Sequence, residues 1–264
     1  MIHEASFAYS QYKDLIEDVT IEDVEAVRAG LLRSFSIESY IYGNITINNA
    51  KGLINLVFKD LEPVYLEPSD RPTDKIACIA LGSKKELKID AKVDDSCWSS
   101  YFIFGERTIQ LSAIMQLGFG FLKAYFFDEL RNKKKLGYIV ESRLDFFEKI
   151  LGISFSVSSD SFSADRIYSE AKATLDGFYE HILSVSDEEF NSSKVSLIAG
   201  ILKRNRTIEE WMSELVLTAV LNGDTDYGKK LCEEVNKVSK QDVADLFKDK
   251  FSLSAGSVFV VSVN

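Results

Sequence analysis

Residues 126–142 constrain the fold of this chain more than any other stretch, because they combine a helix end, a glycine and a strand start. A helical apolar pattern runs to Leu136, and the alternating pattern of a strand begins at Tyr138. Gly137 lies between them, where we expect a left-handed residue to end the helix. Arg131 lies on the last turns of the helix, so its side chain and that of Tyr138 are expected to reach the same end of one sheet.

The rest of the chain alternates between strand and helix patterns. These patterns predict strands at Lys75–Leu81, Glu86–Ala91, Trp98–Phe104, Tyr138–Phe146, Ile153–Val157 and Ser257–Val263. A nearly unbroken apolar run predicts one long buried helix over Arg107–Leu136. Further helices are expected from Ala164 and after the capping boxes Ser186–Glu189 and Thr207–Glu210. We therefore expect an α+β fold, with helices packed on one face of a mainly antiparallel sheet.

Proline placement divides the chain into three segments. All three prolines lie between Pro63 and Pro72, and proline favours extended backbone both at its own position and at the residue before it. We therefore predict a proline-containing linker at residues 60–73. The segment before it, residues 1–59, is predicted to be the C-terminal part of a preceding α+β unit. Residues 74–264 are predicted to form a complete α+β unit.

The two ends of the chain share one pattern, which indicates an internal repeat. Thr20 and Asp23 have the spacing of a helix N-cap and its third residue, and so do Ser239 and Asp242. A short strand is expected after each of these helices, at Ser39–Tyr42 in the first case and at Ser257–Val263 in the second. The chain is thus expected to hold the tail of one repeat followed by a whole second repeat.

Composition excludes several classes of function. The net charge of −10 and the pI near 4.9 argue against a nucleic-acid-binding protein, which needs a surplus of Lys and Arg on one face, and against a membrane partner. The cations of residues 131–135 fit the negative end of a helix dipole without a bound anion. The three cysteines lack CxxC spacing and no signal peptide is visible, so we expect reduced thiols in a cytoplasmic protein.

Candidate catalytic groups are scarce. The sequence has two histidines, His3 and His181, and neither has a second histidine within a helical turn, so no metal site is expected. The Gly118 and Gly120 pair lies inside the predicted buried helix, where small residues permit close helix packing, and not in a phosphate-binding loop. No catalytic residue is predicted in this chain.

Arg131 and Tyr138 are the two residues with an open functional interpretation. A guanidinium and a phenol at the same end of a sheet can hold a peptide carbonyl. Tyr138 can equally be an ordinary tyrosine at the edge of the core with a satisfied hydroxyl. The residues themselves leave both interpretations standing.

A motif around these two residues resembles that of a known family. The pattern Phe-x-x-Leu-Arg-x-Lys-x-x-Leu-Gly-Tyr-Ile-Val is carried here by Phe127, Leu130, Arg131, Lys133, Leu136, Gly137, Tyr138, Ile139 and Val140. It resembles the C-terminal half of the insulin-degrading enzyme and pitrilysin family of zinc peptidases. The stretch Ile41-Tyr-Gly-Asn44 also resembles the family's strand end that closes the third unit. The family usually has Gln where this chain has Lys135, and commonly Thr where it has Asn132.

The resemblance implies a fold and a function. Four similar α+β units form two halves around an enclosed chamber, and the zinc motif His-x-x-Glu-His of the first unit is absent from this sequence. By motif position, Arg131 and Tyr138 correspond to the fourth-unit arginine and tyrosine that contact the substrate near the scissile bond. The chain is thus expected to be a C-terminal, non-metal-binding wall of the chamber, inactive alone.

The resemblance also implies partners. Zinc and catalysis would come from the N-terminal half of the same protein, and a peptide would be the substrate. The alternative is a non-catalytic scaffold or binding subunit that keeps the fold without the chemistry. Residues 1–59, being part of a unit, are expected to expose an apolar face and to self-associate.

Overall fold

The computed structural model describes residues 9–33, 39–59, 83–91, 94–147, 150–203, 206–216, 226–251 and 257–263. The chain divides into two units: the first is Met1–Cys78 with Asn205–Val216, and the second is Ile79–Arg204 with Leu217–Asn264. The predicted linker at residues 60–73 and the predicted strand at Lys75–Leu81 lie outside the described residues.

The first unit is helical where it is described. Its helices are α1 (Tyr9–Ile16), α2 (Ile21–Arg33), α3 (Ile47–Lys59) and α7 (Ile208–Val216). The predicted capping box opens α2: the Thr20 N–H donates to Asp23 Oδ2 at 2.9 Å, and the Asp23 N–H donates to Thr20 Oγ1 at 3.2 Å. The predicted strand at Ser39–Tyr42 is wrong, because these residues form no strand. No partner strand occurs among the described residues of this unit, and a lone strand cannot satisfy its backbone hydrogen bonds.

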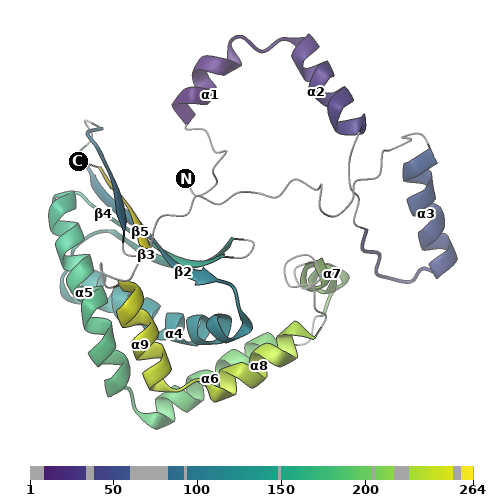
Figure 1. The fold of residues 1–264 in the computed structure, drawn as a ribbon. Helices are drawn as coiled ribbons and strands as arrows, with labels where there is room; N and C mark the ends of the chain where they lie inside the picture. Colours follow the sequence, from purple (N-terminus) through teal and green to yellow (C-terminus); the bar gives the residue numbers. More distant parts are fainter. Residues whose placement is uncertain are drawn as a thin grey trace. The chain divides into compact units, whose positions relative to one another are not determined.

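The second unit is built on a mixed sheet of five strands (Figure 1). The strands are β1 (Lys84–Ile89), β2 (Ser96–Glu106), β3 (Ile139–Phe147), β4 (Ile150–Ser159) and β5 (Ser257–Val263). Their order is β1-β5-β2-β4-β3; β1 pairs with β5 in parallel, and the other three pairs are antiparallel. The sheet is therefore mainly antiparallel, with β3 at one edge.

Helices of the second unit pack on one face of this sheet, as the α+β prediction states (Figure 1). They are α4 (Ile109–Phe127), the π-helix η2 (Asp128–Lys133), α5 (Ala164–Ser184), α6 (Asp187–Ile201), α8 (Tyr227–Lys237) and α9 (Lys240–Phe251). Serine hydroxyls cap the N-termini of two of these helices, α6 and α9. Ser186 Oγ accepts from the Glu189 N–H at 3.1 Å, and Ser239 Oγ accepts from the Asp242 N–H at 3.1 Å.

The core lies between the sheet and the helices and is rich in phenylalanine. Along β4, alternate residues are buried toward the helices: Leu151, Ile153, Phe155 and Val157. Phe155 contacts rings from β2, α4 and α9, namely Phe102, Phe126 and Phe251. The intervening serines of β4 lie on the opposite face, where Ser156 Oγ is 2.9 Å from Ser99 Oγ of β2. The alternation expected from the sequence is thus present.

Candidate functional site

The end of α4 is wider than an ordinary helix and leads directly to the motif residues. After Phe127 the chain continues as the π-helix η2, whose last turn is closed by the Lys134 N–H donating to Glu129 O at 3.0 Å. The predicted helix over Arg107–Leu136 therefore begins two residues later and ends as a π turn. Such turns are frequent at functional sites.

The left-handed residue at this helix end is Lys135, with a φ of 51°, and not Gly137. The prediction that Gly137 is left-handed is therefore wrong. Gly137 is needed for another reason: a Cβ placed there would lie 2.2 Å from the carbonyl oxygen of Ser158 on β4. The chain passes so close to β4 at this point that only a glycine fits.

Arg131 is held by the backbone of this same turn. Its Nη1 donates to the carbonyl oxygen of Gly137 at 2.5 Å, and the residue as a whole is exposed. A guanidinium carries five N–H donors, so one bond leaves others available. Arg131 thus contacts the residue immediately before Tyr138.

Tyr138 lies at the same end of the sheet, 48% exposed. Its backbone N–H donates to Ser158 O at 3.0 Å, which anchors it beside β4. Its phenol O–H donates to Asp95 Oδ2 at 2.7 Å. That bond is the main cause of a raised phenol pKa, with burial and the negative charges of Asp95 and Asp160 adding to it.

Arg131 and Tyr138 therefore lie at the same edge of the sheet, at the start of β3, where Arg131 bonds to the residue before Tyr138. Sequence reasoning missed the third member of this group, Asp95, which directly precedes β2. Asp95 is 43 residues from Tyr138 along the chain, and no local pattern links the two. Only the pairing of β2 and β3 with β4 brings them together.

The described residues do not fit a metal centre. No three His, Cys, Asp or Glu side chains among them gather as a possible metal site. The ring of His181 stacks on Tyr125, with centroids 4.2 Å apart and planes 20° apart, and burial lowers its pKa. His3 lies outside the described residues. Of the helices that the structure describes, none has the length and apolarity to cross a bilayer.

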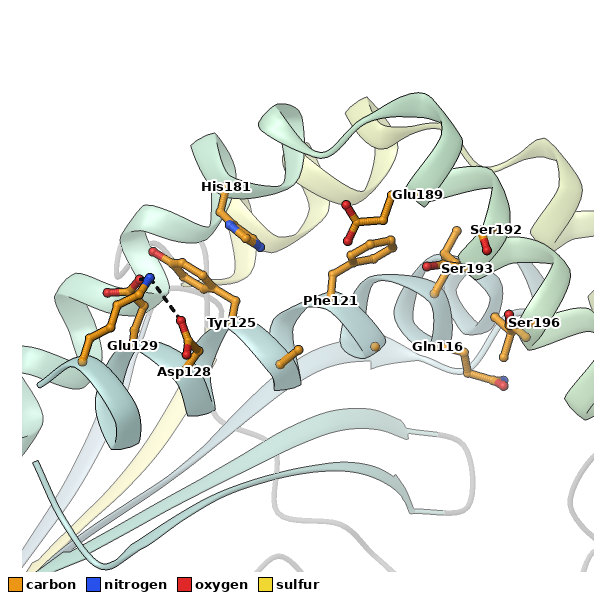
Figure 2. A pocket seen from close by; sticks show the side chains of 15 residues that line it. Gln116, Phe121, Tyr125, Asp128, Glu129, His181, Glu189, Ser192, Ser193 and Ser196 are labelled. Atoms are coloured by element: carbon orange, nitrogen blue, oxygen red, sulfur yellow. Dashed lines mark hydrogen bonds and ion pairs between the residues drawn. The ribbon is translucent and has the colours of Figure 1, made fainter. Parts of the chain in front are cut away.

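A groove of about 640 Å³ lies on the helical side of the second unit (Figure 2). It runs between α4 and η2 on one side and the end of α5 and α6 on the other. Its lining includes Gly120, Phe121, Tyr125, Glu129, Lys133, His181, Glu189 and Ser196. The Lys133 ammonium is paired with Glu129 Oε1 at 2.6 Å and Asp128 Oδ2 at 3.1 Å, so the lining is acidic on balance. No pattern in the sequence indicates this groove.

Several known proteins are similar to this chain over nearly its whole length. Residues 119–216 match the family model described as PQQ synthase PqqF-like, C-terminal lobe domain 4. The chain is 24% identical over 97% of its length to the Arabidopsis thaliana protein named insulin-degrading enzyme-like 1, peroxisomal, and covers 27% of it. The family model and this relative support a C-terminal part of an insulinase-like M16 protease.

Further insulinase-like relatives match over the same region. The Drosophila melanogaster insulin-degrading enzyme is 26% identical over 100% of this chain, which covers 27% of that relative. A crystal structure of pitrilysin has a TM-score of 0.85 at 20% identity, covering 98% of this chain and 28% of pitrilysin. The fold is thus that of an insulinase-like C-terminal region. The chain spans about a quarter of the length of the curated relatives it matches.

Proposed function

We propose that this chain forms a wall of the substrate chamber of an insulinase-like zinc peptidase and contacts the peptide near the scissile bond. The observation that supports this most is the placement of Arg131 and Tyr138 at one exposed edge of the sheet. The Arg131 guanidinium would donate to the backbone of the bound peptide with the N–H groups not given to Gly137. The Tyr138 hydroxyl would donate to the oxyanion that develops on the attacked carbonyl.

The electrostatic role of Tyr138 has an expected size. A donor aimed at a developing oxyanion typically contributes about 3–4 kcal/mol to transition-state stabilisation, because the charge grows only as the reaction proceeds. Arg131 would act mainly on substrate orientation, since its guanidinium offers N–H donors to backbone carbonyls that stay neutral throughout the reaction. Loss of Tyr138 should therefore lower kcat, and loss of Arg131 should mainly raise KM.

Catalysis also requires the part of the protein that carries the family's zinc motif. The sequence has no His-x-x-Glu-His, and the described residues offer no metal site. We propose that the N-terminal half supplies the zinc, and that this chain is inert by itself. We propose a cytoplasmic location on the basis of the free thiols of Cys97 and Cys232.

Restoring the N-terminal half of the parent protein allows a direct test. With peptide substrates, Tyr138→Phe should lower kcat about 10²- to 10³-fold, because the oxyanion loses its donor. Tyr179→Phe, on α5, is the matched control and should leave kcat unchanged. Equal kcat values for the two variants would contradict the proposed role of Tyr138.

The alternative function is a non-catalytic scaffold or binding subunit of the same fold. The first unit favours an extensive contact with another polypeptide, because α2 and α3 contain no buried residue. Their exposed apolar side chains include Val24, Val27, Leu31, Leu53 and Leu56. The two functions separate by one observation: a parent open reading frame that encodes His-x-x-Glu-His supports the peptidase, and its absence supports the scaffold. Sedimentation of this chain alone would measure its self-association through residues 1–59.

A further inference from the structure

The hydroxyl of Tyr138 is already committed in this structure. A phenol has one proton to donate, and Tyr138 donates it to Asp95 Oδ2 at 2.7 Å. It cannot donate the same proton to a substrate carbonyl at the same time. We propose that Asp95 is the resting partner of Tyr138 and that the reacting peptide must displace it. This inference rests on the proposed function of Tyr138.

The position of the pair allows such an exchange. Asp95 directly precedes β2 and Tyr138 directly precedes β3, and β4 lies between these strands, so the two side chains meet across the end of β4. Both residues are exposed. The backbone at Tyr138 stays fixed by Ser158 O and by the bond from Arg131 to Gly137 O. The phenol can therefore leave Asp95 by side-chain rotation, without repacking of the core.

The charge on Asp95 decides when the exchange is favourable. A carboxylate accepts a stronger hydrogen bond than a neutral peptide carbonyl does. Asp95 therefore keeps the phenol while the substrate carbonyl is neutral. An oxyanion is charged like the carboxylate, so it can compete for the proton once the carbonyl is attacked. With Asp95 present, the Tyr138 hydroxyl thus stabilises only the transition state. Removing Asp95 should free this hydroxyl to bind the unreacted peptide as well.

Steady-state kinetics of the parent protein with its N-terminal half can test this exchange. Asp95→Ala should raise kcat/KM about 2- to 10-fold and lower KM, because the peptide no longer displaces the hydrogen bond to Asp95, which water weakens at this exposed site. The increase should vanish in the Asp95→Ala/Tyr138→Phe double variant. Asp94→Ala is the matched control, since Asp94 is an exposed acid in the same connection. It removes the same charge, and should leave kcat/KM close to that of the wild type.

The outcomes separate this inference from the proposed function. Equal effects of Asp95→Ala and Asp94→Ala would overturn the inference, and so would a fall of kcat/KM in Asp95→Ala to the level of Tyr138→Phe. In either case the function stands if Tyr138→Phe still lowers kcat. A Tyr138→Phe variant with unchanged kcat would overturn both.

An ultraviolet titration of this chain supplies a second readout that needs no activity. Subtracting the Tyr138→Phe spectrum isolates the ionisation of Tyr138, whose pKa the Asp95 bond raises. Asp95→Ala should lower this pKa toward its ordinary value, while Asp94→Ala should leave it in place. An unchanged pKa in Asp95→Ala would mean that the bond does not form in solution, and would overturn the inference.

Discussion

Gly118 on α4 lies directly against Phe247 on α9: a Cβ placed at Gly118 would be 2.5 Å from Phe247 Cε2. The same Cβ would lie 2.8 Å from Val243 Cγ1. Both α9 side chains are fully buried. The close approach of the two helices over the sheet therefore depends on the absence of a side chain at this position.

We expect Gly118→Ala to lower the free energy of unfolding by about 1–3 kcal/mol, because the added methyl group overpacks the core. Gly120→Ala is the control on the same helix, since no heavy atom lies within 4 Å of its added Cβ. Alanine there should raise stability by about 0.5–1 kcal/mol through its better helix propensity. Urea denaturation followed by circular dichroism measures both changes.

Lys135 holds a left-handed conformation that a glycine adopts more easily. We expect Lys135→Gly to raise the free energy of unfolding by about 0.5–1 kcal/mol, since a left-handed L-residue costs about 1–2 kcal/mol and glycine recovers part of it. Lys134→Gly is the contrast, because Lys134 has a φ of −87° and its ammonium pairs with Glu170 Oε2 at 3.1 Å. That variant should be destabilised in the same denaturation experiment.

His181 should make stability depend on pH. Burial lowers the pKa of His181 from 6.5. The negative charges of Glu189 and Glu129 raise this pKa in part, and the positive charge of Lys133 lowers it further. The unfolded chain therefore binds a proton first as the pH falls, so stability present above pH 6.5 is lost progressively below it. His181→Phe keeps a ring against Tyr125 and should remove this part of the pH dependence. An identical pH dependence in both proteins would contradict the assignment.

The capping box of α9 offers a fourth prediction. Ser239→Ala removes a helix cap and should cost about 0.5–2 kcal/mol at neutral pH. Ser239 also holds the pKa of Asp242 below 3.8, so the difference from wild type should shrink as the pH falls through that lowered pKa. Ser196→Ala, an exposed serine inside α6, serves as the control and should change stability little. Thermal unfolding at neutral and acidic pH tests both statements.

The parts of the fold that follow local patterns could be predicted from the sequence. Ser257–Val263 forms β5 with the expected bounds, and the capping serines Ser186 and Ser239 start α6 and α9. These features depend on short-range periodicity and on hydrogen bonds between residues three apart. The prediction that small residues allow close helix packing is confirmed at Gly118, and Gly120 has no such contact.

The parts set by distant contacts could not be predicted. Gly137 was expected to be left-handed because it follows a helix, but the carbonyl of Ser158, on another strand, is what requires it. The partner of Tyr138 was invisible for the same reason, since Asp95 approaches it only through the order of the sheet. The substrate-binding role of Arg131 and Tyr138 stays a prediction.

The wide π turn of η2 has a consequence for how this region tolerates change. A π turn closes over five residues instead of four, so deleting one residue from Asp128–Lys133 would shift the residues that follow relative to α4. Gly137 and Tyr138 would then lose their alignment with Ser158 of β4. Substitution of exposed side chains in this segment is compatible with the fold, whereas a change in the number of its residues is not. Insertions and deletions here are expected to be far more harmful than point substitutions.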